Sequence, residues 1–226
     1  MNTYTKYWFL EGFNLFNKLG RITMMRMCEI LEMENINKGS VIELLKDDRK
    51  SIFFLKKGTV KIIDSNSKTV KYIVKKGNIF GELSLYDQEK ASEEEAIAIE
   101  DCIVCYIESA RMKTIMEKHT SLKNGVLKVY GLRIKKLERR LQDLLYKDST
   151  TRIKEFIIDY INEFGERKNE SLVAKNLLTH KDIANLTNTS RQTVSNTLSK
   201  LRKEGIIDYD TQTITLIHKK QHTIHT

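Results

Sequence analysis

The stretch Thr187 to Gly205, TNTSRQTVSNTLSKLRKEG, carries polar side chains that could hydrogen-bond together to another polar surface. If the stretch is a helix, Val194, Leu198 and Leu201 recur at i, i+4 and i+7 and form one buried face. The opposite face then holds Arg191, Gln192, Ser195, Asn196 and Ser199. Guanidinium and amide groups match the donor and acceptor patterns of base edges in the DNA major groove. The alternative is a solvated surface helix.

Local signals predict where this helix begins and ends. Ser190 is a good N-cap, because its hydroxyl can accept a hydrogen bond from an amide near Thr193. Gly205 supplies the C-terminal stop. The polar residues therefore follow directly on a capped helix start.

A second helix is expected just before it, from about His180 to Leu186. Thr179 would cap this helix, with Asp182 three residues on, as a variant of the capping box. Asn188 suits the tight turn between the two helices, because Asn tolerates the left-handed conformation.

The flanking segments complete a compact unit over residues 149–226. Residues 150–165, TTRIKEFIIDYINEFG, carry apolar side chains at helical spacing, and residues 206–217 read as a two-stranded wing turning at Asp210 to Gln212. Helix, tight turn, helix and hairpin together predict a winged helix-turn-helix.

A long helical period precedes this unit, from about Ser109 to Tyr146. Two sets of apolar residues, each spaced by seven, interleave along it as an a/d seam: Leu127, Ile134 and Leu141 with Tyr130, Leu137 and Leu144. A one-sided seam between two domains favours a two-helix coiled coil and hence a homodimer. The alternative is a helix lying on its own domain. We expect residues 109–148 to be the dimerisation helix and hinge, with Asp148 as the pivot.

The first part of the chain, residues 1–108, has a strand pattern. From about Asn37 to Glu108, short apolar runs alternate with turn signals at intervals that favour an antiparallel barrel or roll. DSNSK, residues 64–68, suits a hairpin tip, because Asp, Asn and Ser bond locally to the backbone. The first 35 residues are richer in helix formers, and we expect short helices packed on the roll. The predicted fold class is α+β.

Charge is unevenly distributed along the 226 residues. The formal net charge is +9, and residues 109–148 alone hold eleven basic and four acidic side chains. This balance favours a polyanionic partner.

The sequence has no apolar run long enough to cross a bilayer, its first residues do not resemble a signal peptide, and its three cysteines form no disulfide framework. We therefore expect a cytoplasmic protein with no membrane partner.

Three motifs together resemble the CRP/FNR family of bacterial transcription regulators. They are Ile79 to Leu83 (IFGEL), similar to the family's phosphate-binding cassette; Asp148 to Ile153 (DSTTRI), similar to its hinge; and Ser190 to Ser195 (SRQTVS), close to its S-R-E-T-V-[SG]. The resemblance covers residues 37–217. It implies an N-terminal antiparallel β-roll of the cyclic-nucleotide-binding jelly-roll type, a long dimerisation helix and a C-terminal winged helix-turn-helix. The implied partners are a second copy of the chain, double-stranded DNA with an inverted-repeat site, and RNA polymerase if the protein is an activator.

The resemblance also implies roles for residues of the helix-turn-helix. Arg191 would bond guanine N7 and O6. Gln192 stands where the family usually has Glu, which shifts the expected half-site towards adenine. Asn196 stands where an arginine often reads a second guanine, so it should favour adenine or make no base contact. Ser190, Thr193 and His180 would bond phosphates, and Ser195 lies on the reading face.

The effector pocket departs from the pattern of cyclic-AMP-binding members, which hold the phosphate with an Arg-Ser pair and the purine with a Thr-Ser pair. The corresponding positions here are Gly81, Glu82, Leu83, Ser84, Ser92 and Glu93. Ser92 to Glu95 replaces the Arg-Ser pair with carboxylates, and Leu137-Glu138 replaces the Thr-Ser pair. Carboxylates repel a phosphate, and the sequence shows no nearby group that compensates them. The pattern therefore argues against cyclic nucleotide binding.

Other effectors stay open. An FNR-type iron–sulfur cluster needs four cysteines, whereas this chain has Cys28, Cys102 and Cys105. Cys102 and Cys105 lie three apart in a strand-like run and would face opposite ways, so we expect core cysteines. Haem or a gas or redox signal remains possible, with His119, a Met, Cys28 or Tyr130 as ligand, as does effector-free DNA binding. The tail residues His218, His222 and His225 could bind a metal or belong to a disordered terminus, and we predict no metal site.

Two rival functions have less support. A ligand-binding module that regulates an enzyme would need a catalytic domain, and none fits in the remaining residues. No Ser-His-Asp set, phosphate loop or metal-ligand cluster stands out, so we expect no enzyme.

Overall fold

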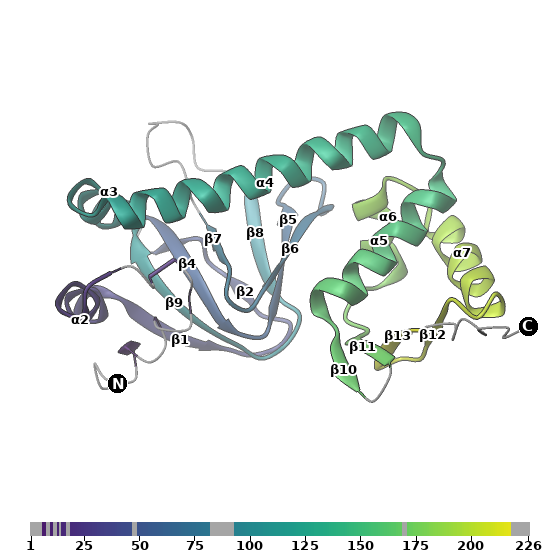
Figure 1. Cartoon of the computed structure of the whole chain (residues 1–226), viewed down its shortest axis with the longest axis horizontal. Coiled ribbons are helices and arrows are strands. Elements are labelled where there is room, and N and C mark those ends of the chain that lie inside the picture. The colour runs from purple at the N-terminus through teal and green to yellow at the C-terminus, as the bar shows by residue number, and fades with distance from the viewer. Residues whose placement is uncertain are drawn as a thin grey trace, which may run out of the picture. The chain divides into compact units, whose positions relative to one another are not determined.

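The structure is a computed structural model that describes residues 6–7, 10, 13, 15–16, 19–46, 49–81, 93–168 and 171–217. The chain divides into two compact units, 1–138 and 139–226, which share the long helix α4 (Thr120–Tyr146). Figure 1 labels the elements along the chain. No helix in the described ranges has the length and apolarity that a membrane crossing needs.

The first unit is built on two antiparallel sheets, and both belong to the predicted roll. One sheet has the strand order β1-β9-β4-β3, with β7 also pairing with β4, and the other has the order β2-β8-β5-β6. The strands are β1 (Glu32–Ile36), β2 (Val41–Ile42), β3 (Leu45–Lys46), β4 (Arg49–Lys57), β5 (Thr59–Asp64), β6 (Val70–Lys75), β7 (Ile79–Gly81), β8 (Glu94–Ala98) and β9 (Cys102–Glu108). The antiparallel roll is therefore confirmed.

Alternation along the strands produces two separate cores. On β4, Phe53 and Leu55 enter the cluster between the two sheets, while Ile52 and Phe54 enter a second cluster on the outer face. The inner cluster also takes residues from β2, β5, β6, β7, β8 and β9. Since successive strand residues face opposite ways, one strand serves both cores.

Helices cover the outer cluster. These are α2 (Arg21–Ile30), α3 (Ser109–Lys118) and the first turns of α4, which contribute Met24, Met27, Met112, Leu122 and Val126 among others. The expected early helix is present, but the sheet begins at Glu32, earlier than the predicted Asn37, because β1 pairs along its length with β9. The predicted helical segment is also broken at His119, where φ is −131° and ψ is 87°.

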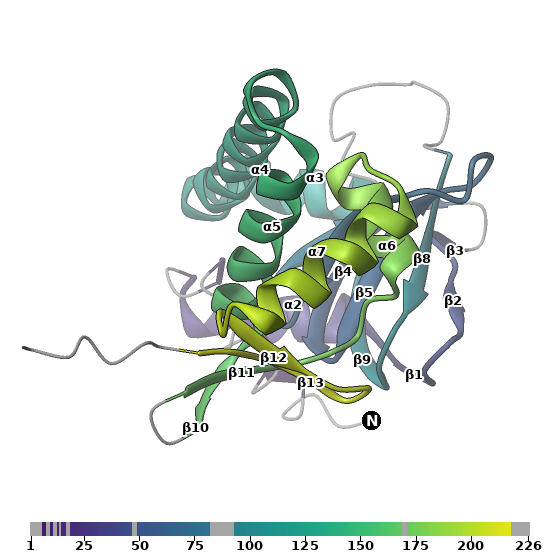
Figure 2. The same ribbon diagram turned by 90° about the vertical axis from the view of Figure 1, so that its right-hand side faces the viewer.

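The second unit is the predicted winged helix-turn-helix. Three helices, α5 (Ser149–Phe164), α6 (His180–Thr187) and α7 (Arg191–Lys203), pack with a sheet of strand order β10-β11-β13-β12. The strands are β10 (Glu166–Lys168), β11 (Ser171–Lys175), β12 (Ile207–Tyr209) and β13 (Thr213–Leu216). Figure 2 shows this sheet below the three helices. Ile153, Ile157, Val194, Leu198 and Leu201 are buried, which confirms the apolar stripes of α5 and α7.

Candidate nucleic-acid interface and effector pocket

The start of α7 is capped as the sequence predicts. The Ser190 hydroxyl accepts a hydrogen bond from the Thr193 amide at 3.0 Å, and the two side-chain hydroxyls lie 2.8 Å apart. Hydroxyl caps satisfy amides that the helix leaves without partners. The first turn of α7 is therefore held by Ser190 and Thr193, and the side chains of Arg191, Gln192 and Asn196 are not needed for that purpose.

The preceding helix and turn also match the prediction. Thr179 and Asp182 form a reciprocal capping box, in which the Asp182 amide donates to the Thr179 hydroxyl at 3.1 Å and the Thr179 amide donates to the Asp182 carboxylate at 3.0 Å. Asn188 adopts the left-handed conformation, with φ 49° and ψ 58°. This single residue redirects the chain from α6 into α7.

The predicted reading residues lie together on the open side of α7. Arg191, Gln192 and Asn196 are exposed, and Thr193 and Ser195 are half-buried. The Gln192 amide donates to the Asn196 side-chain oxygen at 3.0 Å. Within the described ranges, the Arg191 guanidinium has no ion-pair or hydrogen-bond partner. Arg191 can therefore donate hydrogen bonds to external acceptors without first breaking a salt bridge, and the paired amides of Gln192 and Asn196 lie beside it.

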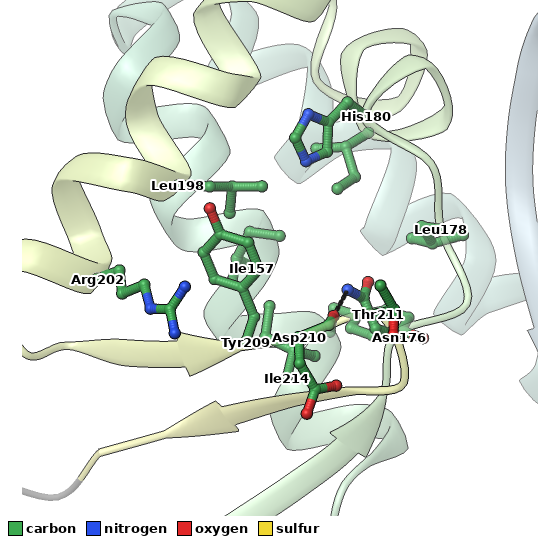
Figure 3. Close-up of a pocket in the computed structure, with 12 residues that line it drawn as sticks. Ile157, Asn176, Leu178, His180, Leu198, Arg202, Tyr209, Asp210, Thr211 and Ile214 are labelled. Atoms are coloured by element: carbon green, nitrogen blue, oxygen red, sulfur yellow. Dashed lines mark hydrogen bonds between the residues drawn. The ribbon is translucent and has the colours of Figure 1, made fainter.

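His180 lies apart from that group, at the rim of a hollow of about 370 Å³ (Figure 3). Ile157, Leu198 and Ile214 line the hollow, and the wing adds Tyr209 and Asp210. Across the hollow, the Asn176 amide donates to the Asp210 carbonyl at 2.7 Å, which ties the segment before α6 to the wing. The structure thus brings His180 together with the wing.

Of the predicted effector-pocket residues, the described ranges contain only Gly81 and Glu93. Glu82, Leu83, Ser84 and Ser92 lie outside them. Gly81 has φ +98°, and a Cβ at this position would lie 2.5 Å from the Ser51 carbonyl oxygen. Glycine is therefore required here by the backbone, whatever the pocket binds.

The carboxylates after this gap are paired with the β5–β6 hairpin. Glu94 forms an ion pair with Lys71 at 2.7 Å and Glu95 with Lys68 at 2.5 Å. Glu93 accepts a hydrogen bond from the Asn66 side chain. The expectation that no nearby group compensates these carboxylates is wrong, because the hairpin lysines are close in space but more than twenty residues away in sequence.

An aromatic and cationic group lies beside this pair. The Tyr72 hydroxyl is 3.4 Å from the Glu94 carboxylate, and burial raises the pKa of Tyr72 to about 12. The Arg133 guanidinium of α4 lies 3.9 Å from the centroid of the Tyr72 ring. Such a cation–π contact ties α4 to the roll.

The cysteines belong to the cores, as predicted. Cys102 enters the cluster between the sheets, whereas Cys105 enters the outer cluster with Cys28. Burial raises the pKa of Cys102 to about 11 and that of Cys105 to about 12, so the thiols are not activated. No group of three or more His, Cys, Asp or Glu in the described part of the chain is placed to hold a metal. His218, His222 and His225 lie outside that part.

The apolar residues of the predicted seam are largely exposed on α4. The side chains of Leu127, Ile134, Leu137, Leu141 and Leu144 are between 36% and 59% accessible. Tyr130, the sixth, is half-buried and packs against the outer cluster of its own unit. Leu132, Leu145 and Tyr146 are also exposed and were not part of the predicted seam. Exposure of so many leucines on one helix is unusual unless a partner covers them.

Asp148 caps α5. Its carboxylate accepts hydrogen bonds from the Thr151 amide at 3.0 Å and the Thr151 hydroxyl at 2.7 Å. Sequence reasoning missed two residues around this point, Arg140 and Arg152, which donate to carbonyls of α6 and of the following turn. Arg152 is marked in the sequence only by its place in the DSTTRI motif, four residues after the cap, and Arg140 has no such signal, because the carbonyls they bind in α6 and its turn lie 35 to 45 residues away.

Comparison with known proteins gives matches over both units. The profile of the cyclic nucleotide-binding domain matches residues 33–119, and that of the Crp-like helix-turn-helix domain matches residues 151–221. The anaerobic regulatory protein of Bacillus subtilis is 24% identical, over 77% of this chain and 75% of that protein. The global nitrogen regulator of Synechococcus elongatus is 24% identical, over 86% of each. A CooA variant from Carboxydothermus hydrogenoformans has a similar fold, with a TM-score of 0.69 at 21% identity, covering 92% of this chain and 90% of that one.

Proposed function

The chain belongs to the CRP/FNR family of bacterial transcription regulators, and we propose that it binds double-stranded DNA as a homodimer, through α7. The observation that carries the proposal is the face of α7, where Arg191, Gln192 and Asn196 are exposed while Val194 and Leu198 anchor the helix. A recognition helix needs this division, because the side chains that contact DNA bases must not also be needed to pack the helix against the rest of the domain.

Each polar residue has a distinct role in this proposal. Arg191 bonds guanine N7 and O6, and Gln192 bonds adenine N6 and N7, with Asn196 holding the Gln192 amide in position. Ser190, Thr193 and His180 bond phosphates and set the register, and Ser195 lies on the same face. The two half-sites form an inverted repeat with centres about one helical turn apart.

The dimer forms along α4. Its exposed leucines would be covered by the same leucines of a second copy, because a two-fold axis brings one surface against itself. The seam runs from Leu127 to Leu144 and ends close to Asp148, where α5 begins. The proposed pivot therefore adjoins the dimer contact.

The roll senses an effector that is neither cyclic AMP nor an iron–sulfur cluster. Lys71 and Lys68 are committed to Glu94 and Glu95, so a phosphate would have to displace carboxylates and then lie beside them. Haem or a gas or redox signal, and effector-free binding, are the alternatives. We place the protein in the cytoplasm, where it would contact RNA polymerase if it activates transcription.

DNA binding is tested by fluorescence anisotropy and by selection from randomised duplexes. We expect an inverted repeat to emerge, with affinity falling steeply as salt rises, since each phosphate contact adds about −0.9 to the slope of log K against log salt. A flat salt dependence with no selected sequence would refute DNA reading by this chain.

The dimer is tested by sedimentation of two matched variants of α4. Leu137 and Leu132 are equally exposed, at 59%, but only Leu137 belongs to the seam. Leu137→Glu should give monomers and lose specific DNA binding, whereas Leu132→Glu should remain dimeric. Dissociation by both variants, or by neither, would contradict the seam.

A further inference from the structure

The last carbonyls of α6 and of the turn after it point at two guanidinium groups. The Arg152 Nε donates to the Thr187 carbonyl and its Nη2 to the Asn188 carbonyl, each at 3.0 Å. The Arg140 Nη2 donates to the Asn185 carbonyl at 3.3 Å. Arg140 belongs to α4 and Arg152 to α5, so two other helices hold the end of α6.

Arg152 makes a third contact that lies outside the helix-turn-helix. Its Nη1 donates to the Lys147 carbonyl at 2.6 Å, immediately after α4 ends at Tyr146. One side chain thus joins the end of α4, the Thr187 carbonyl and the Asn188 carbonyl. A guanidinium suits this task, because its N–H groups are fixed in a planar fork that a lysine cannot reproduce.

Electrostatics favours the contacts of Arg140 and Arg152 with the carbonyls at the end of α6. Carbonyls at a helix C-terminus carry partial negative charge, and cations stabilise them. Arg152 is half-buried, and burial lowers the pKa of Arg140, so solvent screens the contacts only partly. The contacts bracket the point where the chain turns, because Asn188, which accepts from Arg152, holds the left-handed conformation that ends α6.

Other ion pairs at the hinge do not reach α6. Lys147 pairs with Asp143 and Glu155, and Arg139 pairs with Asp159 at 3.2 Å. These contacts lie within α4 or join it, or the residue after it, to α5. Among the hinge contacts named here, only those of Arg140 and Arg152 extend to the helix-turn-helix turn.

We propose that Arg152 and Arg140 form a carbonyl clamp that makes the helix-turn-helix turn move with the end of α4. The clamp positions α7, because the turn at Asn188 sets the direction in which α7 leaves α6. A change at the dimer helix then reaches the reading residues through these guanidinium groups. The inference rests on the proposed DNA-binding function and names its route of regulation.

The clamp is tested in the full chain by hydrogen exchange and duplex binding. The variants are Arg152→Gln, Arg152→Lys and Arg140→Gln, and the matched control is Arg139→Gln, which removes the same charge from the same turn of α4. The amides of Asn188 and Thr189, bonded to Asn185 and Ala184, report on the turn. We expect their exchange to rise about tenfold or more in all three clamp variants, and to stay unchanged in the control and in strands β11 and β13.

DNA binding separates positioning from a direct phosphate contact. Specific affinity should fall about tenfold with an unchanged salt slope, whereas loss of a phosphate contact would reduce the slope by about one. Unchanged exchange at the turn, full rescue by Arg152→Lys, or a slope reduced by one would overturn the clamp. If Arg152→Gln does not fold, Arg140→Gln and its control decide. If the wild-type chain binds no duplex, the proposed function fails, while hydrogen exchange still tests the clamp.

Discussion

Helix α7 and strand β8 both carry polar residues at positions where the resemblance to the CRP/FNR family implies that a ligand binds. On α7, Arg191 is exposed and has no partner in the described part of the chain. On β8, Glu94 and Glu95 are each paired with a lysine of the neighbouring hairpin. A charged group in an ion pair must weaken that pair before it can bind an external charge, so Arg191 is prepared for an external partner, whereas Glu94 and Glu95 are not.

The most direct way to break the comparison is Arg191→Ala. Losing a bidentate guanine contact should cost about 1–3 kcal/mol of specific binding per half-site. Thermal stability should change little, because the exposed guanidinium makes no hydrogen bond or ion pair within the described part of the chain. Anisotropy and a thermal melt measure the two quantities, with Arg167→Ala on exposed β10 as the charge control. An affinity equal to that of the control would show that α7 does not read guanine through Arg191.

Gln192→Glu sharpens the comparison, because it should change the base that α7 recognises while keeping the hydrogen bond between residues 192 and 196. A carboxylate can still accept a hydrogen bond from the Asn196 amide, so the couple should persist after an amide flip. Glutamate accepts from cytosine N4, whereas glutamine matches adenine. The preferred base at one position should change from adenine to cytosine, by about 1–3 kcal/mol. Selection from randomised duplexes reports the change, and an unaltered consensus would remove Gln192 from the reading set.

The paired edge of the roll predicts a null result with cyclic nucleotides. A ligand at a hundred times its dissociation constant adds about 2.7 kcal/mol to the free energy of unfolding, which a thermal melt detects easily. We expect no shift with cyclic AMP or cyclic GMP. A stabilising shift would mean that the ion pairs of Glu94 and Glu95 open for a ligand. Haem belongs in the same experiment, since a shift with haem alone would favour the alternative sensor.

Glu94→Gln is expected to have a smaller effect, confined to the roll. It removes the ion pair with Lys71, whose side chain is 42% accessible against 13% for Glu94, so the free energy of unfolding should fall by about 1 kcal/mol. Duplex affinity should not change, because the substitution leaves the second unit intact. A large loss of DNA affinity would show that this pair, which lies beside Tyr72 and Arg133, controls α4.

Sequence patterns predicted features that depend on neighbours within a few residues. The Ser190 cap, the Thr179–Asp182 box and the left-handed Asn188 are local, because each hydrogen bond or dihedral involves residues at most four apart. The alternation that separates Cys102 from Cys105 is local in the same sense.

Features that depend on residues distant in sequence were missed, or were predicted with the wrong boundaries. The compensation of Glu94 and Glu95 comes from another hairpin, and β1 is a strand because β9 pairs with it. The carbonyls that Arg152 binds are acceptors in every residue type, so no side chain marks them as partners. The caps and polar face of α7 were therefore easier to predict than the arginine contacts that hold the end of α6.

The smallest predicted effect concerns Asp148, another carboxylate committed to the fold. Hydrogen bonds from the Thr151 amide and hydroxyl lower the pKa of Asp148 below its ordinary value. A group whose folded pKa is lowered adds stability above its unfolded pKa, and that stability is lost as the pH falls through the folded pKa. The melting temperature of the wild type should therefore slightly exceed that of Asp148→Asn at neutral pH, and the gap should close below about pH 4. Asp159→Asn, which breaks a surface ion pair but no helix cap, is the control. A gap that stays constant down to pH 3 would mean that the Asp148 charge does not contribute to the cap, and that asparagine serves the hinge equally well.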